Sequence, residues 1–117
     1  NKVFDLLLQK YPEDKIGTEV PTNTGSIDIV KVSKKELIFY EIKTENDIKK
    51  NIRSAISQLL EYAYWNKVEG VERLIIIGPN IPTSKAIEYL ETLRNKFGIP
   101  IYYQHYDIDK AVLNDCV

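Results

Sequence analysis

Two carboxylates and one lysine lie within segments that otherwise have the apolar composition of β-strands. Asp28 interrupts the apolar run of residues 27–30, and Glu41 and Lys43 flank Ile42 near the end of the next apolar run. Charged groups in half-buried strands cost free energy unless they are paired or bind a metal. Side chains at positions i and i+2 of a strand point to the same face, so we expect Glu41 and Lys43 to project together.

These residue types suit a magnesium site that acts on phosphodiester bonds. Mg²⁺ prefers carboxylate oxygens and keeps several waters, so Asp28 and Glu41 could hold it together with the backbone carbonyl of Ile42. The ion would polarise a phosphate and lower the pKa of a bound water. Lys43 could orient or deprotonate that water, or offset charge on the phosphate. The alternative is a structural ion pair of Lys43 with Glu41 or Asp28, because this spacing is a common coincidence.

The elements that must position these residues follow from hydrophobic periodicity and turn residues. In the first half of the chain we expect a helix over 1–11 ended by Pro12, a strand over 16–20, a turn over 22–25, a strand over 26–32, a turn over 33–35 and a strand over 36–43. In the second half we expect a helix over 47–66, a strand over 73–77, a helix over 83–97 and a strand over 99–103. A hairpin of the second and third strands can bring Asp28 beside Glu41.

The order α-β-β-β-α-β-α-β predicts an α/β fold with a mixed central sheet and helices on both faces. The helices over 47–66 and 83–97 would be the crossover connections. On the first of them, one apolar stripe consists of Ile48, Ile52, Ala55, Ile56, Leu59 and Ala63. Gln58 and Tyr62 share a face on the shoulder of this stripe, where they can reach polar partners at the edge of the sheet. Alternatively, they are boundary residues of a packed helix.

Three short motifs, in this order, resemble the PD-(D/E)XK nuclease superfamily, in particular members with a QxxxY motif such as RecB-like nucleases and NucS-like endonucleases. The motifs are Gly25-Ser26-Ile27-Asp28-Ile29, Glu41-Ile42-Lys43 and Gln58-Leu59-Leu60-Glu61-Tyr62. The resemblance implies a restriction-endonuclease-like αβββαβ core over residues 1 to about 77, roughly two-thirds of the chain, extended by a further helix and strand. Asp28 lacks the preceding proline of the superfamily's name, a proline that is often absent.

Carried over by position, the resemblance makes Asp28 and Glu41 ligands of Mg²⁺ or Mn²⁺ and Lys43 the catalytic lysine. Gln58 and Tyr62 would support the site or touch the substrate.

Members of the superfamily often add an acidic residue from the first helix. Asp5 is the acid that the helix over 1–11 offers here. Glu19, at the end of the first expected strand, is a second candidate for a supporting or substrate-binding role. Its alternative is a solvent-facing residue beside a turn.

The net charge of −1 argues mildly against a protein held on DNA by phosphate contacts. Basic residues nevertheless gather in one stretch: Lys31, Lys34, Lys35, Lys43, Lys49, Lys50 and Arg53. This stretch could bind a nucleic-acid backbone, or it could be a solvated surface.

The 117 residues predict a single domain over 1–117, and the missing initiator Met predicts a piece of a longer protein with further domains. Cys116, expected in a frayed tail, has no partner for an intramolecular disulfide, which suits the cytoplasm. No segment approaches the roughly 20 apolar residues of a membrane span.

The leading hypothesis is a Mg²⁺- or Mn²⁺-dependent nuclease domain that hydrolyses phosphodiester bonds in nucleic acid, with DNA as the expected substrate. Duplex-cutting relatives often act as dimers, so a homodimer is a further expectation. A second hypothesis keeps the fold without catalysis, as a module that binds nucleic acid or a partner protein. A third, an unrelated small α/β binding module, requires all three motif matches to be coincidence.

Overall fold

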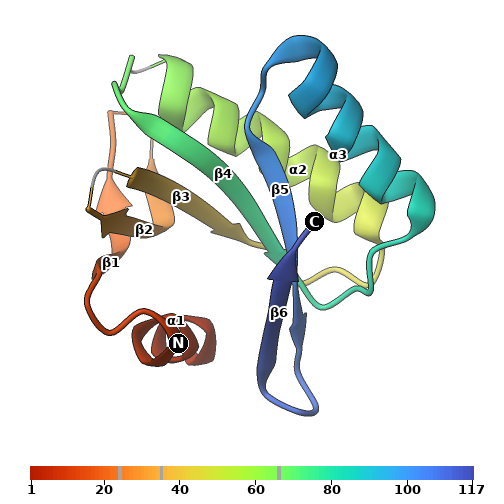
Figure 1. Ribbon diagram of the computed structural model, residues 1–117, viewed down its shortest axis with the longest axis horizontal. Coiled ribbons are helices and arrows are strands. Elements are labelled where there is room, and N and C mark those ends of the chain that lie inside the picture. Colours follow the sequence, from red (N-terminus) through yellow and green to blue (C-terminus); the bar gives the residue numbers. More distant parts are fainter. Residues whose placement is uncertain (24, 35, 66) are drawn as a thin grey trace.

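The structure, a computed structural model, describes residues 1–23, 25–34, 36–65 and 67–117. Over these residues, six strands form one sheet in which sequence neighbours lie side by side, in the order β1-β2-β3-β4-β5-β6 (Figure 1). The strands are β1 (Lys15–Pro21), β2 (Ser26–Ser33), β3 (Glu36–Ile42), β4 (Val71–Gly78), β5 (Ile101–Asp107) and β6 (Val112–Cys116).

Three α-helices flank the sheet: α1 (Lys2–Lys10), α2 (Ile48–Leu60), which continues as the π-helical turn η1 (Glu61–Trp65), and α3 (Ser84–Phe97). Strands β1, β2 and β3 pair antiparallel, whereas β4 is parallel to both β3 and β5. Parallel neighbours need crossover connections, which α2 and α3 provide. The expected element order and mixed α/β sheet are confirmed, and the arrangement is compatible with a restriction-endonuclease-like core.

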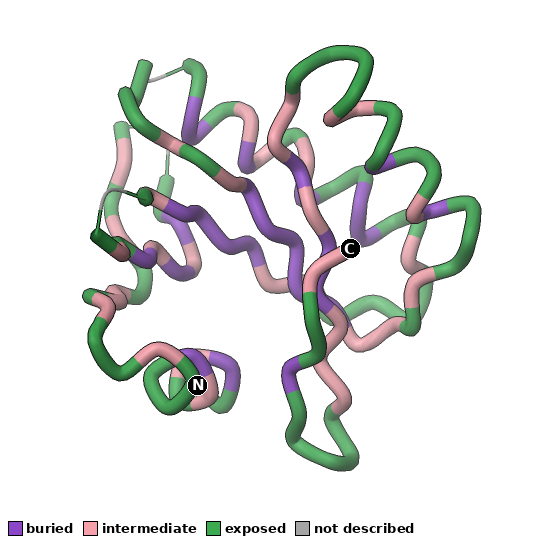
Figure 2. The backbone as a smooth tube through the Cα atoms, in the orientation of Figure 1, coloured by how far each residue is buried: buried purple, intermediate pink, exposed green. Residues whose placement is uncertain are grey.

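Each face of the sheet has its own apolar core. Helices α2 and α3, with η1, cover one face, and α1 covers the other (Figure 1). Residues of β4 alternate between the two: Leu74 and Ile76 enter the α2 side, and Ile75 and Ile77 enter the α1 side. This apolar run is therefore buried on both faces, as its composition predicted. Buried residues concentrate in these central strands (Figure 2).

Lys31, one of the basic residues expected on a surface, is buried. Its ammonium group lies 3.3 Å from Asp14 Oδ2 and 3.6 Å from the centroid of the Tyr11 ring. A buried charge is tolerated only with such partners, and these ones tie β2 to the segment after α1. The expectation that Lys31 contributes to a basic surface is therefore wrong. Lys35 lies outside the described residues.

The C-terminal residues form a strand that the sequence patterns did not predict. Strand β6 pairs antiparallel with β5, and Leu113 is buried in the core on the α1 side. Cys116 is half-buried in this strand, so the expected frayed tail is wrong.

Strand β5 begins two residues later than expected, because residues 98 and 99 complete the end of α3. Gly98 adopts a left-handed conformation with φ 68°, and the N–H of Ile99 donates to the carbonyl of Leu93 at 3.1 Å. This arrangement satisfies the last carbonyls of the helix.

Three of the expected elements include undescribed residues. They are the turn over 22–25 (Thr24), the turn over 33–35 (Lys35) and the end of the helix over 47–66 (Asn66). Among the helices of the described ranges, none is long and apolar enough to cross a membrane.

Candidate active site

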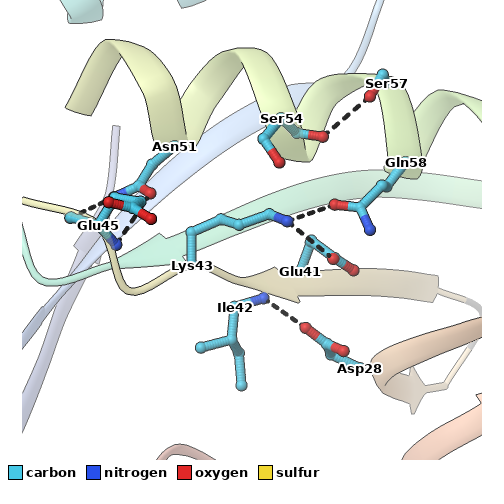
Figure 3. Close-up of polar contacts among 9 residues, drawn as sticks. All are labelled: Asp28, Glu41, Ile42, Lys43, Glu45, Asn51, Ser54, Ser57 and Gln58. Atoms are coloured by element: carbon cyan, nitrogen blue, oxygen red, sulfur yellow. Dashed lines mark hydrogen bonds and ion pairs between the residues drawn. The ribbon is translucent and has the colours of Figure 1, made fainter. Parts of the chain in front are cut away.

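Glu41 lies at the end of β3 and Lys43 directly follows the strand, and both side chains point toward α2, as the i, i+2 spacing predicted (Figure 3). Lys43 Nζ lies 3.5 Å from Glu41 Oε2. The Glu41 side chain is only 5% exposed, whereas the Lys43 side chain is 19% exposed. The pair therefore lies between the protein core and solvent, with the carboxylate buried and the ammonium group partly exposed.

Asp28 reaches this point from β2, where the β2–β3 ladder stops. The ladder ends at the pair of Ile29 with Tyr40, so Asp28 and Glu41 are next in register. The Ile42 N–H donates to Asp28 Oδ2 at 2.9 Å (Figure 3), so the side chain occupies a place that a strand carbonyl would otherwise take. In an extended strand the C=O of a residue lies on the same edge as its N–H, which directs the Ile42 carbonyl toward Asp28.

Helix α2 supplies the second partner of Lys43. The ammonium group donates to Gln58 Oε1, and Figure 3 shows the lysine side chain extended between the helix and the strand end. Tyr62, four residues further on, is buried in the core rather than at its boundary. Burial raises the pKa of Tyr62, and the carboxylates of Glu41 and Asp28 raise it further.

The electrostatics of Glu41 are unusual. Its pKa is raised to about 7. Burial is the largest cause, the neighbouring Asp28 carboxylate acts in the same direction, and the Lys43 ammonium opposes the rise. Glu41 Oε1 is buried and accepts no hydrogen bond from any described residue. A second cation at this oxygen would satisfy it and offset the repulsion between the two acids. Two carboxylates with a free oxygen are the donor set of a hard divalent cation, so the residues present fit Mg²⁺ or Mn²⁺.

Glu19 lies within β1 and is exposed, as the solvent-facing alternative predicted, although it is not beside a turn. Its neighbours Thr18 and Val20 pair with Ile29 and Ile27 of β2, on either side of Asp28. Its backbone is in the left-handed region, with φ 47°. Glu19 and Asp28 line one hollow of about 340 Å³ on the α1 side of the site. In the described part of the chain no three His, Cys, Asp or Glu residues are grouped to hold a metal, so Glu19 does not complete a three-acid set. Asp5 is exposed on α1 and does not line this hollow.

Sequence reasoning missed a hydrogen-bonded group of polar residues next to the site, Asn51, Asn80 and Tyr103, which we call the polar clamp. Asn51 of α2 is fully buried and donates to the Glu45 carbonyl at 2.8 Å and to Asn80 Oδ1 at 2.7 Å. The Tyr103 hydroxyl donates to the Asn80 carbonyl at 2.9 Å. A Cβ atom at Gly78 would lie 2.7 Å from the Tyr103 hydroxyl oxygen, so this approach requires glycine. The clamp fixes the loop that follows Lys43.

A signal for Asn51 was present, because it precedes Ala55 and Gln58 by four and seven residues and so shares their face of the helix. The partners Asn80 and Tyr103 lie in distant segments and left no local signal.

No protein-family profile matches this sequence, and no curated protein matches it. Two solved structures resemble it. A protein of unknown function, AF1548, superposes with a TM-score of 0.56 at 18% identity, over 88% of this chain and 58% of that chain. An XisH family protein from Nostoc punctiforme superposes with a TM-score of 0.49 at 16% identity, over 99% of this chain and 96% of that one. The chain thus spans a little over half the length of AF1548, and likeness at these identities concerns the fold alone.

Proposed function

We propose that this chain is a metal-dependent nuclease domain of the PD-(D/E)XK type that hydrolyses phosphodiester bonds, with DNA as its substrate. The observation that carries the proposal is the buried Glu41 carboxyl group, which has a free oxygen, a neighbouring acid in Asp28 and a lysine two residues away. The superfamily assignment and the choice of DNA rest on the three sequence motifs.

Asp28 and Glu41, with the Ile42 carbonyl, would hold Mg²⁺ or Mn²⁺. When bound, such an ion polarises a phosphate and lowers the pKa of water. Of the two acids, Asp28 is already held in place by the Ile42 N–H. Glu41 is held on one oxygen by Lys43 and leaves the other for the cation.

The surroundings of Lys43 fix its position. Glu41 and Gln58 hold the ammonium group between the strand end and α2. Because the side chain is still partly exposed, it can meet a phosphate or a water molecule that enters from solvent. A positive charge that is already in place costs no reorganisation when negative charge develops on the phosphate. Lys43 would therefore stabilise that charge or orient the attacking water.

A second candidate function is a module of the same fold that binds nucleic acid or a partner protein without catalysis. The observation in its favour is that Lys43 is already satisfied by Glu41 and Gln58, as a structural ion pair would be. It gives no account of the buried, unpartnered Glu41 Oε1.

Cleavage of plasmid and single-stranded DNA tests the proposal. We expect wild-type protein to cut in Mg²⁺ or Mn²⁺, to stop when EDTA is added, and to lose activity on Asp28→Ala substitution, because Asp28 would hold the ion. Cleavage in EDTA, or cleavage that persists in Asp28→Ala, would contradict the proposal and point to a contaminant or to other chemistry.

Gln58→Ala should lower the cleavage rate at saturating substrate by about 10- to 100-fold, the range typical of residues that orient a metal-site partner. The physical reason is that Lys43 would lose the acceptor that holds it against α2. Ser57→Ala is a matched control on the adjacent residue, since the Ser57 hydroxyl donates to the Ser54 carbonyl of its own helix at 3.0 Å. Equal rates for the two variants would show that Gln58 has no positioning role.

A further inference from the structure

A polar hollow of about 470 Å³ opens beside Lys43, between the end of β3 and the first turns of α2. Lys43, Lys50 and Ser54 are among the residues that line it. Lys50, Ser54 and Gln58 follow one another at intervals of four along α2 and so share a face. Figure 3 shows Ser54 on the turn of α2 between Asn51 and Gln58, above the Lys43 side chain. The hollow therefore continues the candidate active site along the helix.

The shape of this hollow is fixed before any ligand enters. Asn51 lines it and is fully buried, with its amide group bonded to Glu45 and Asn80. The Glu45 N–H in turn donates to Asn51 Oδ1 at 3.2 Å. Preformed hollows with a few fixed polar groups are the usual form of small binding sites.

The charges around the hollow favour an anion. Lys50 is exposed and, within the described ranges, takes part in none of the ion pairs. It lies in the first turn of α2, which contains no acidic residue. The Asp47 carboxylate caps this helix end and accepts from the Lys49 and Lys50 N–H groups at 2.9 and 3.4 Å. The Lys50 ammonium group itself has none of the ion-pair partners found among the described residues, so an anion in the hollow would supply one. The acid in the lining, Glu45, is exposed to solvent.

We propose that this hollow binds a backbone phosphate of the nucleic-acid strand. This phosphate would be next along the strand to the one that is cleaved at Glu41 and Lys43. Lys50 supplies the counter-charge and the Ser54 hydroxyl donates a hydrogen bond to a phosphate oxygen. This inference rests on the proposed function, because it takes the ligand of the neighbouring site to be nucleic acid.

Fluorescence anisotropy with a short labelled DNA duplex in EDTA tests the subsite without cleavage. Binding is measured from about 50 to 200 mM salt, where the slope of log K against log salt reports neutralised phosphates. We expect Lys50→Ala to reduce the magnitude of that slope by about 0.9. Ser54→Ala removes a hydrogen bond and no charge, so it should weaken binding about tenfold and leave the slope unchanged.

Lys49→Ala is the matched control. It removes the same charge from the adjacent exposed residue, which does not line the hollow. We expect its slope to equal that of the wild type. Equal effects of Lys49→Ala and Lys50→Ala, no effect of either, or no DNA binding by the wild type would overturn the subsite. A wild type that binds DNA through Lys50 but never cuts it in Mg²⁺ or Mn²⁺ would overturn the nuclease function and retain the subsite.

Discussion

Lys43→Ala should lower the cleavage rate by about 10²- to 10⁴-fold, the range for a general acid–base group or a fixed charge at a reacting phosphate. The protein should still bind DNA and a divalent ion, because Asp28 and Glu41 remain. The loss follows from geometry: the ammonium group lies 3.5 Å from a proposed metal ligand and faces partly into solvent. Single-turnover cleavage of a labelled duplex, with Mn²⁺ binding measured in parallel, separates the two effects.

The experiment needs a range of pH values, because Lys43 lowers the pKa of Glu41. Its removal raises that pKa further, and Mn²⁺ binding near neutral pH will weaken for this reason alone. At about pH 9 Glu41 should be ionised in both proteins, and the remaining difference in rate then belongs to Lys43. Lys85→Ala, at an exposed residue of α3, is the control. Cleavage by Lys43→Ala as fast as cleavage by Lys85→Ala at high pH would show that Lys43 has no part in catalysis.

Glu41→Gln should make the metal-free protein more stable at about pH 8, by at most about 3 kcal/mol. The folded state raises the pKa of Glu41 from 4.5 to about 7, so between these values it binds more protons than the unfolded chain. Stability from this group is therefore present at low pH and is lost as the pH rises toward 7. The uncharged amide avoids that loss, and the two proteins should have similar free energies of unfolding at about pH 4.

Urea unfolding in EDTA across this pH range measures the difference. Glu72→Gln, which replaces an exposed acid on β4, should show no comparable gain. Mn²⁺ should then stabilise the wild type and leave Glu41→Gln unchanged, since binding to the folded state alone adds stability. A Glu41→Gln protein no more stable than wild type at about pH 8 would mean that the carboxyl group is not strained by burial.

Local periodicity was enough to predict most of the elements that carry the site. The i, i+2 rule placed Glu41 and Lys43 on one face, and four-residue spacing on α2 placed Gln58 where it meets Lys43. These predictions succeed because the contacts depend on the geometry of single elements. The roles of these residues remain predictions.

Features that depend on distant partners were not predictable from local patterns. The Ile42 N–H can donate to the Asp28 side chain because the pairing of β2 with β3 ends at that point. The sequence around Lys31 is typical of a surface residue. In the fold, Asp14 and the Tyr11 ring, from the segment that follows α1, contact its ammonium group. Strand β6 is short and polar at its centre, and pairing with β5 rather than its own composition makes it a strand.

Titration of metal-free protein with Mn²⁺, followed by electron paramagnetic resonance, tests the central claim most directly. Wild type should bind Mn²⁺ with an affinity that rises as the pH increases through about 7, where Glu41 loses its proton. Asp28→Asn and Glu41→Gln should each lose that binding, while folding remains intact by circular dichroism. Absence of binding by the wild type at about pH 8, or binding by either variant as tight as that of the wild type, would contradict a shared ion between the two acids.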